Sequence, residues 1–120
     1  MKAMKDVIYA GLSEVFGAEK VSDEYPYQWK QGTAIQLTEE QNKVLEYDST
    51  AGETKSYLRY RIDVYGDKNT SHDVLKVNKV LAGIGFKRTD CMDVPSPGLH
   101  HKLMRYEAIY DLENDALYWE

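Results

Sequence analysis

The sequence predicts an α+β domain in which two amphipathic helices pack against a mostly antiparallel sheet. The first observation is the stretch at 56–66, where apolar residues alternate with others as they do in a strand with one buried face. The second is the segment at 69–84, where apolar residues recur at three- and four-residue steps. Such a strand followed by such a helix makes a two-layer core, and the whole chain then follows the order α-β-β-β-α-β-β.

Helical periodicity predicts the two helices at residues 3–16 and 69–84. Each pattern has one apolar stripe, so each helix can cover a sheet with that side. Gly17 directly follows the first pattern, at a position where glycine commonly ends a helix. The stripes are Met4, Ile8, Leu12, Val15 and Phe16 in the first helix and Val74, Val77, Leu81 and Ile84 in the second.

The ends of the second helix carry their own signals. Several side chains near residue 70 can cap its start, and Asp73 follows Thr70 at the spacing of a capping box. Gly83 and Gly85 are expected to close the helix at positions that need a positive φ.

The other segments predict strands and turns. Pro26 has no N–H, which confines the aromatic segment around it to a strand entry or a sheet edge. Gly32 marks either a bulge or a turn, and the polar residues 39–42 separate two strand-like pieces. The expected strands are residues 25–29, 33–38, 43–48, 56–66, 86–92, 99–112 and 116–119, and the expected turns are residues 49–55, 95–98 and 113–115.

One face of the strand at 56–66 is the candidate binding surface. Tyrosine and arginine are favoured in protein interfaces. On an open sheet the same residues can stack the bases and contact the phosphates of single-stranded nucleic acid. The simplest interpretation is a solvated face with cross-strand ion pairs. This face carries Tyr57, Arg59, Arg61 and Tyr65, with Asp63 in the same row, while Leu58, Tyr60, Ile62 and Val64 make the dry face.

Length and composition restrict the class of protein. With 120 residues the chain is expected to form a single domain over residues 1–120. Its net charge is −5, which disfavours nonspecific binding to nucleic acid because such binding needs clustered lysine and arginine. Tyrosine is unusually frequent, with 10 residues beside 2 phenylalanines.

The sequence also indicates a compartment. A single cysteine, Cys91, excludes an internal disulfide and favours a reducing compartment, so we expect a cytoplasmic setting. The apolar run at residues 7–12 is too short for a secretion signal, and no run approaches the length of a membrane span.

Four residues raise the question of a metal site. Cys91, Asp93, His100 and His101 are close in sequence, but adjacent histidines on a strand point to opposite faces. We therefore expect no metal site, and instead a small buried cysteine and two solvated histidines.

The sequence carries no signature of catalysis or of a cofactor. It has neither a Gly-x-Ser-x-Gly elbow nor a glycine-rich phosphate loop. His72 follows Ser71, where helix capping explains the pair. The paired carboxylates Glu39 with Glu40, Asp90 with Asp93, and Asp111 with Glu113 lie in polar segments and are expected to be solvated. We therefore expect neither catalytic nor cofactor-binding residues.

Taken together, three segments resemble the tail-terminator family of long-tailed bacteriophages and prophages, also called tail completion or minor tail proteins. The first is an N-terminal amphipathic helix that leads to an x-Pro-Tyr strand entry at residues 25–27. The second is a central strand with Ile-Asp-Val-Tyr at residues 62–65, which runs into a polar-capped helix. The third is a late strand of alternating charge and aromatics at residues 102–108. Two departures from the family are the long link at 39–55 and the tail at 112–120.

This resemblance implies a structural role in the virion tail and no enzymatic one. It implies a homo-oligomeric ring, typically a hexamer, that binds the tail tube protein, stops tube growth and meets a head-tail connector protein. Assembly would take place in the bacterial cytoplasm. The departures leave open whether the chain is a terminator or a neighbouring head-tail connector component. The alternatives from the residues themselves remain a single-stranded nucleic-acid-binding module and a small enzyme or metal protein.

Overall fold

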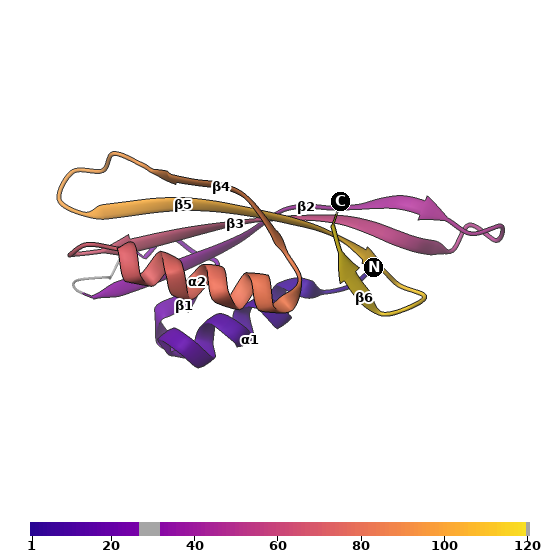
Figure 1. The fold of residues 1–120 in the computed structure, drawn as a ribbon, viewed down its shortest axis with the longest axis horizontal. Helices are drawn as coiled ribbons and strands as arrows, with labels where there is room; N and C mark the ends of the chain where they lie inside the picture. The colour runs from indigo at the N-terminus through magenta and orange to yellow at the C-terminus, as the bar shows by residue number, and fades with distance from the viewer. Residues whose placement is uncertain (27–31, 120) are drawn as a thin grey trace.

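The computed structural model describes residues 1–26 and 32–119, and its fold is the predicted α+β class (Figure 1). Two helices pack against a mostly antiparallel six-stranded sheet, in the expected order α-β-β-β-α-β-β followed by a short last strand, which was also expected near residues 116–119. A 3-10 turn before the first strand was not predicted. The elements are α1 (Met4–Phe16), η1 (Ala18–Lys20), β1 (Val21–Ser22), β2 (Thr33–Tyr47), β3 (Glu53–Gly66), α2 (Ser71–Ile84), β4 (Lys87–Asp93), β5 (His100–Asp111) and β6 (Ala116–Tyr118).

The strands lie in the order β1-β2-β3-β5-β4, and β6 pairs with the far end of β5. Every pairing is antiparallel except that of β1 with β2, which joins only Val21 and Ser22 to Ile35 and Gln36. β3 is the centre of the sheet, because it pairs along its length with β2 on one side and β5 on the other.

Both helices lie on the same side of the sheet, and the core is between these layers (Figure 1). The dry face of β3 is confirmed, since its four predicted residues are fully buried. β5 buries the alternate residues from Met104 to Tyr110 on the same side of the sheet, and Leu112 after it is partly buried. Burial of these side chains is the main source of stability in such a domain. The core residues are Met4, Ile8, Leu12, Val21, Ile35, Leu37, Leu58, Tyr60, Ile62, Val64, Val77, Leu81, Phe86, Met104, Tyr106, Ala108 and Tyr110.

The helix ends follow part of the prediction. Gly17 and Gly85 follow α1 and α2 with φ of 98° and 121°, as expected. Gly83 does not have a positive φ and belongs to the helix, so that prediction was wrong. The capping box is also absent, because Thr70 makes no capping bond. Its expected partner Asp73 instead accepts a hydrogen bond from the Thr33 hydroxyl at 2.8 Å.

The predicted break at residues 39–42 is wrong, because β2 runs through it as one strand of 15 residues. Its pairing with β3 has three register shifts, one at Glu39/Gln41 and two between Val44 and Tyr47, and the first accommodates the polar stretch as a bulge. Gly32 lies in a bend just before β2 with φ of 79°, so it is the turn and not the bulge. Of the predicted strand at 25–29, residues 25 and 26 are outside any strand and the rest lies outside the described residues.

The hairpin of β2 and β3 extends past the helices as an arm, which we define as residues 43–56 (Figure 1). Its turn is held by Asp48, whose Oδ1 accepts hydrogen bonds from the backbone N–H groups of Thr50 and Gly52 at 2.9 and 2.8 Å. The molecule is correspondingly elongated, with principal extents of 54 × 24 × 22 Å. None of the helices in the described ranges has the length and apolar content to cross a membrane.

Candidate interaction surface

The candidate residues lie on the outer face, defined as the side of the sheet that faces away from the helices. Alternation along β3 places its odd-numbered residues there, and the register brings neighbours from β5 and β2 beside them. Opposite Tyr57, Arg59, Arg61, Asp63 and Tyr65 stand Ile109, Glu107, Arg105, Leu103 and His101 of β5, and Lys43, Gln41, Thr38, Gln36 and Ala34 of β2.

The middle of the outer face is a network of ion pairs centred on Glu40. Its Oε1 lies 3.1 Å from the Nε atoms of both Arg59 and Arg105. Arg105 also approaches Asp90 of β4, with Nη1 3.9 Å from Oδ2. The carboxylate thus joins strands β2, β3 and β5 on one surface, and its neighbours remain partly exposed. This is the cross-strand pairing of the simplest interpretation.

One end of the outer face is closed and buried. Asp63 retains only 2% of its surface, and both of its oxygens accept hydrogen bonds from Arg61, at 3.0 and 3.1 Å. His101 Nε2 lies 2.7 Å from Asp63 Oδ1, and the His101 ring stacks on Tyr65 with ring centres 4.3 Å apart. The hydrogen bonds that Arg61 donates to Asp63 raise the pKa of the Arg61 guanidinium. A buried carboxylate is thereby compensated by a bidentate arginine and a histidine.

The two tyrosines of the predicted surface differ in exposure. Tyr65 is buried, donates its hydroxyl to Gln36 Oε1 at 2.9 Å and meets the edge of the Tyr25 ring. Burial, followed by the charge of Asp63, raises the pKa of Tyr65 to about 12. Tyr57 is half-buried and donates to Glu107 Oε2 at 2.7 Å, and burial together with this bond raises its pKa.

The prediction of one continuous wet row was therefore wrong at Asp63 and Tyr65. Tyr57, Arg59 and Arg61 remain partly accessible, but the other two residues are covered by His101 and Tyr25. The sequence analysis missed Glu40, Arg105 and His101 as members of this surface. Only the strand register joins them to β3, and a single sequence carries no direct signal of register.

Charges on the outer face do not favour nucleic acid. Three arginines of the described network, at positions 59, 61 and 105, face four carboxylates, at positions 40, 63, 90 and 107. Binding to phosphates depends on unneutralised cations. The guanidinium groups are already matched by carboxylates, so the alternating tyrosine and arginine pattern is mainly internal to the sheet.

The four residues considered for a metal do not converge. Cys91 is exposed on the edge strand β4, contrary to the expected burial. Asp93 pairs with Lys102 at 3.0 Å, and His100 is exposed. His101 packs against Asp63 with only 9% of its side chain exposed, contrary to the expected solvation. Among residues 1–26 and 32–119, no three histidine, cysteine or acidic side chains are grouped closely enough to hold a metal ion.

The residues considered for acid–base chemistry have structural partners. Glu39 accepts a hydrogen bond from the Tyr60 hydroxyl at 2.6 Å on the inner face, whereas Glu40 faces the other way. Asp111 caps the turn before β6, and its bonds with Asn114 lower its pKa. The Ser71 backbone N–H is bonded to Asn69 Oδ1 at 2.8 Å, which starts the helix one residue before His72.

Ser96, His101 and Asp63 form a linear array that the sequence did not predict. The Ser96 hydroxyl oxygen lies 3.5 Å from His101 Nδ1, which is longer than the 2.6–3.2 Å reach of a nucleophile activated by its base. Asp63 also directs both oxygens to Arg61. The array therefore anchors the β4–β5 turn to the sheet and has no geometry of an activated serine.

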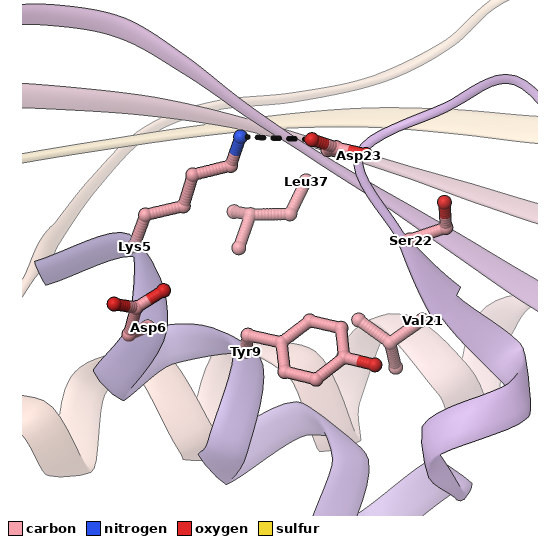
Figure 2. Close-up of a pocket in the computed structure, with 7 residues that line it drawn as sticks. All are labelled: Lys5, Asp6, Tyr9, Val21, Ser22, Asp23 and Leu37. Atoms are coloured by element: carbon pink, nitrogen blue, oxygen red, sulfur yellow. Dashed lines mark hydrogen bonds and ion pairs between the residues drawn. The ribbon is translucent and has the colours of Figure 1, made fainter.

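A pocket of about 400 Å³ lies between α1 and the β1–β2 edge (Figure 2). Leu37 and Val21 contribute buried apolar surface, and Tyr9 borders the pocket from α1. Lys5 Nζ pairs with Asp23 Oδ2 at 3.3 Å across one side, as the dashed line in Figure 2 shows. This ion pair joins α1 to the segment after β1, and the pocket brings no set of reactive groups together.

Two strands of the sheet have edges that can pair with another chain. Beyond Gln36, the outer edge of β2 has no strand partner among the described residues, and neither has the outer edge of β4. Such edges present backbone N–H and C=O groups that can pair with another chain. The family models that were scanned do not match this chain, and a search of curated proteins found no similar protein.

Proposed function

We propose that this chain is a structural subunit of a phage tail, which assembles into a ring in the manner of the tail terminators it resembles. The ring would bind the end of the tail tube, stop its growth and present a surface to the head-tail connector protein. It would belong to the virion tail after assembly in the bacterial cytoplasm, and would act without catalysis or cofactor.

The observation that carries this proposal is the pair of open edges on opposite sides of one sheet. A closed ring needs a heterologous contact, in which one patch of a subunit meets a different patch of the next. The edge of β2 beyond its short pairing with β1 and the edge of β4 are two such patches, and they lie on opposite sides of the sheet. Among the described residues each of these edges is open, which supports repeated addition of copies.

Two further features support assembly that is delayed until a tube end is present. Both edges contain register irregularities, which weaken uncontrolled pairing of strands. The net charge of −5 adds repulsion between free subunits. The arm carries the exposed apolar side chains Leu45 and Tyr47, which suit contact with a neighbouring protein.

The test is to polymerise the tail-tube protein encoded by the same genome with and without this chain. If the proposal is right, tubes become shorter and uniform, with a ring of this protein at one end in negative-stain images. Unchanged tube lengths and no terminal density would contradict it. Salt-sensitive binding to a single-stranded oligonucleotide would instead favour the nucleic-acid-binding function.

A further inference from the structure

We propose that, within such a ring, β4 of one copy adds to the open edge of β2 of the next copy as an antiparallel strand, with Asp90 opposite Lys43 and Lys87 opposite Glu46. The partner of each edge is therefore a second copy of this chain. The inference rests on the proposed function and assigns its subunit contact.

The direction of the strands permits this contact. β2 and β5 run the same way, because each is antiparallel to β3, while β4 is antiparallel to β5. A rotation about an axis parallel to the strands preserves these directions. It places β4 of one subunit antiparallel to β2 of the next, so the sheet continues across the boundary with its usual hydrogen-bond pattern.

In this register, residues that stand opposite each other on β4 and β2 belong to the same face of the sheet. Residues opposite each other in an antiparallel pair point to the same face. Lys43 stands opposite Tyr57 and Asp90 opposite Arg105, so both belong to the outer face. Asn42 stands opposite Leu58 and Cys91 opposite Met104, so both belong to the inner face.

The charges and the irregularities match in the same register. It brings Lys43 to Asp90 and Glu46 to Lys87, which are two pairs of opposite charge. The register of β2 shifts between Val44 and Glu46, and that of β4 shifts between Arg88 and Asp90. In each strand the two charged residues are three positions apart, and a register shift lies between them. When the two strands pair in this register, the bulge of β2 therefore lies beside the bulge of β4.

Symmetric pairing of β2 with β2 or of β4 with β4 is the main competitor. A two-fold contact uses the same edge of both copies and stops at a dimer, leaving the other edge of each subunit uncovered. The contact between β4 and β2 covers both edges of every subunit once the ring closes. A native mass above that of a dimer distinguishes the two.

The first experiment is a charge swap, with native mass and sedimentation of the chain, alone and together with tail-tube protein, as readouts. Lys43→Glu and Asp90→Lys should each weaken self-association by roughly tenfold, because each places like charges opposite each other. Both substitutions in one chain should restore association to about the wild-type level. Lys79→Glu on the exposed side of α2 is the matched control and should have no effect.

The second experiment uses the native cysteine. In the proposed register Asn42 of one copy stands opposite Cys91 of the next, within the Cα separation that a disulfide requires. Under mild oxidation the Asn42→Cys variant should form a covalent ladder that ends at the size of the ring. Lys43→Cys, on the other face of the same strand, should form no such ladder.

The outcomes separate this inference from the proposed function. Rings that cap tubes, but show no rescue in the charge-swapped double variant and no ladder with Asn42→Cys, would overturn the strand contact alone. A wild-type product that stops at a dimer linked through Cys91 would establish β4 with β4 instead. Absence of any self-association, with and without tail-tube protein, would overturn both proposals.

Discussion

At the scale of single residues, Asp63 and its partners decide which part of the outer face is accessible. The carboxylate is buried, and its two oxygens are held by Arg61 and His101. The residue pattern of β3 correctly placed Asp63 on the outer face, but it did not predict that another side chain buries this carboxylate. That side chain is a histidine 38 positions away, whose position depends on the register of β5.

We predict that Asp63→Asn lowers the free energy of unfolding by about 2 kcal/mol, because it removes the charge that compensates Arg61 while keeping the shape. Urea denaturation at neutral pH measures this change. Asp67→Asn, at an exposed position after β3, is the matched control and should change stability by less than about 0.5 kcal/mol. Equal effects of the two substitutions would show that the pairing of Asp63 is not important for stability.

Buried tyrosines give the protein a predicted alkaline limit. The pKa of Tyr65 is raised to about 12 by burial, compared with about 10 for an unfolded tyrosine. A folded pKa above the unfolded one means that the stabilisation is complete below pH 10 and is lost as the pH rises to 12. Burial raises the pKa values of Tyr60 and Tyr106 in the same direction.

We therefore expect stability to fall between pH 10 and 12, with Tyr65 alone contributing on the order of 2 kcal/mol to that fall. Urea denaturation at several pH values measures it. The Tyr65→Phe variant should start from a lower stability at neutral pH, because it loses the bond to Gln36, and should then fall less steeply. Identical slopes would contradict the assigned contribution of Tyr65.

At the scale of elements, the glycines near the end of α2 have different roles. A Cβ on Gly83 would meet nothing within 4 Å, and this residue has helical geometry. A Cβ on Gly85 would come 3.2 Å from the Leu117 Cβ, and the backbone there has φ of 121°. The helix thus ends where its chain must turn past β6.

We predict opposite effects of one substitution at these two positions. Gly83→Ala should raise the free energy of unfolding by about 0.5 to 1 kcal/mol, because alanine is the better helix former. Gly85→Ala should lower it by about 1 to 2 kcal/mol, because of the unfavourable φ and the contact with Leu117. Thermal and urea denaturation of both variants measure the difference. A change of the same sign in both would contradict this helix boundary.

Elements with a clear period were predictable, and elements that depend on partners were not. The stripes of α1 and α2 and the alternation of β3 identified both layers of the core before any contact was known, except that Val15 of the first stripe is exposed. The polar stretch of β2 was not recognised as part of a continuous strand, because pairing with β3, with three register shifts, maintains the strand without apolar alternation. β1 is only two residues long, and nothing local distinguishes it from a loop.

At the scale of the whole molecule, the sheet has a dry face under the helices and an outer face whose charges are paired. In the part of the chain that the structure describes, it also has two open edges, along β4 and along β2 beyond Gln36. The candidate residues were placed on the outer face correctly from the sequence, and their binding role stays a prediction. Arg59 is held by Glu40, a pairing that depends on strand register and that residue spacing does not reveal, whereas Arg61 is held by Asp63 two residues further along the same face of β3. Which strands form the edges of the sheet could not be predicted from the sequence either, because strand order is a property of the complete fold.

This arrangement predicts that the free protein does not bind single-stranded DNA with the salt dependence of a phosphate-binding surface. Glu40→Gln provides the sharper test, because it leaves Arg59 and Arg105 without their shared carboxylate while preserving its size. If paired charges are what prevents binding, this variant should gain weak, salt-sensitive affinity for a labelled oligonucleotide, and the wild type should show none. Fluorescence anisotropy at low and physiological salt measures both proteins, and Glu24→Gln, on an exposed residue after β1, controls for the change in net charge. Tight binding by the wild type would mean that the outer face, and not the strand edges, is the functional surface of this protein.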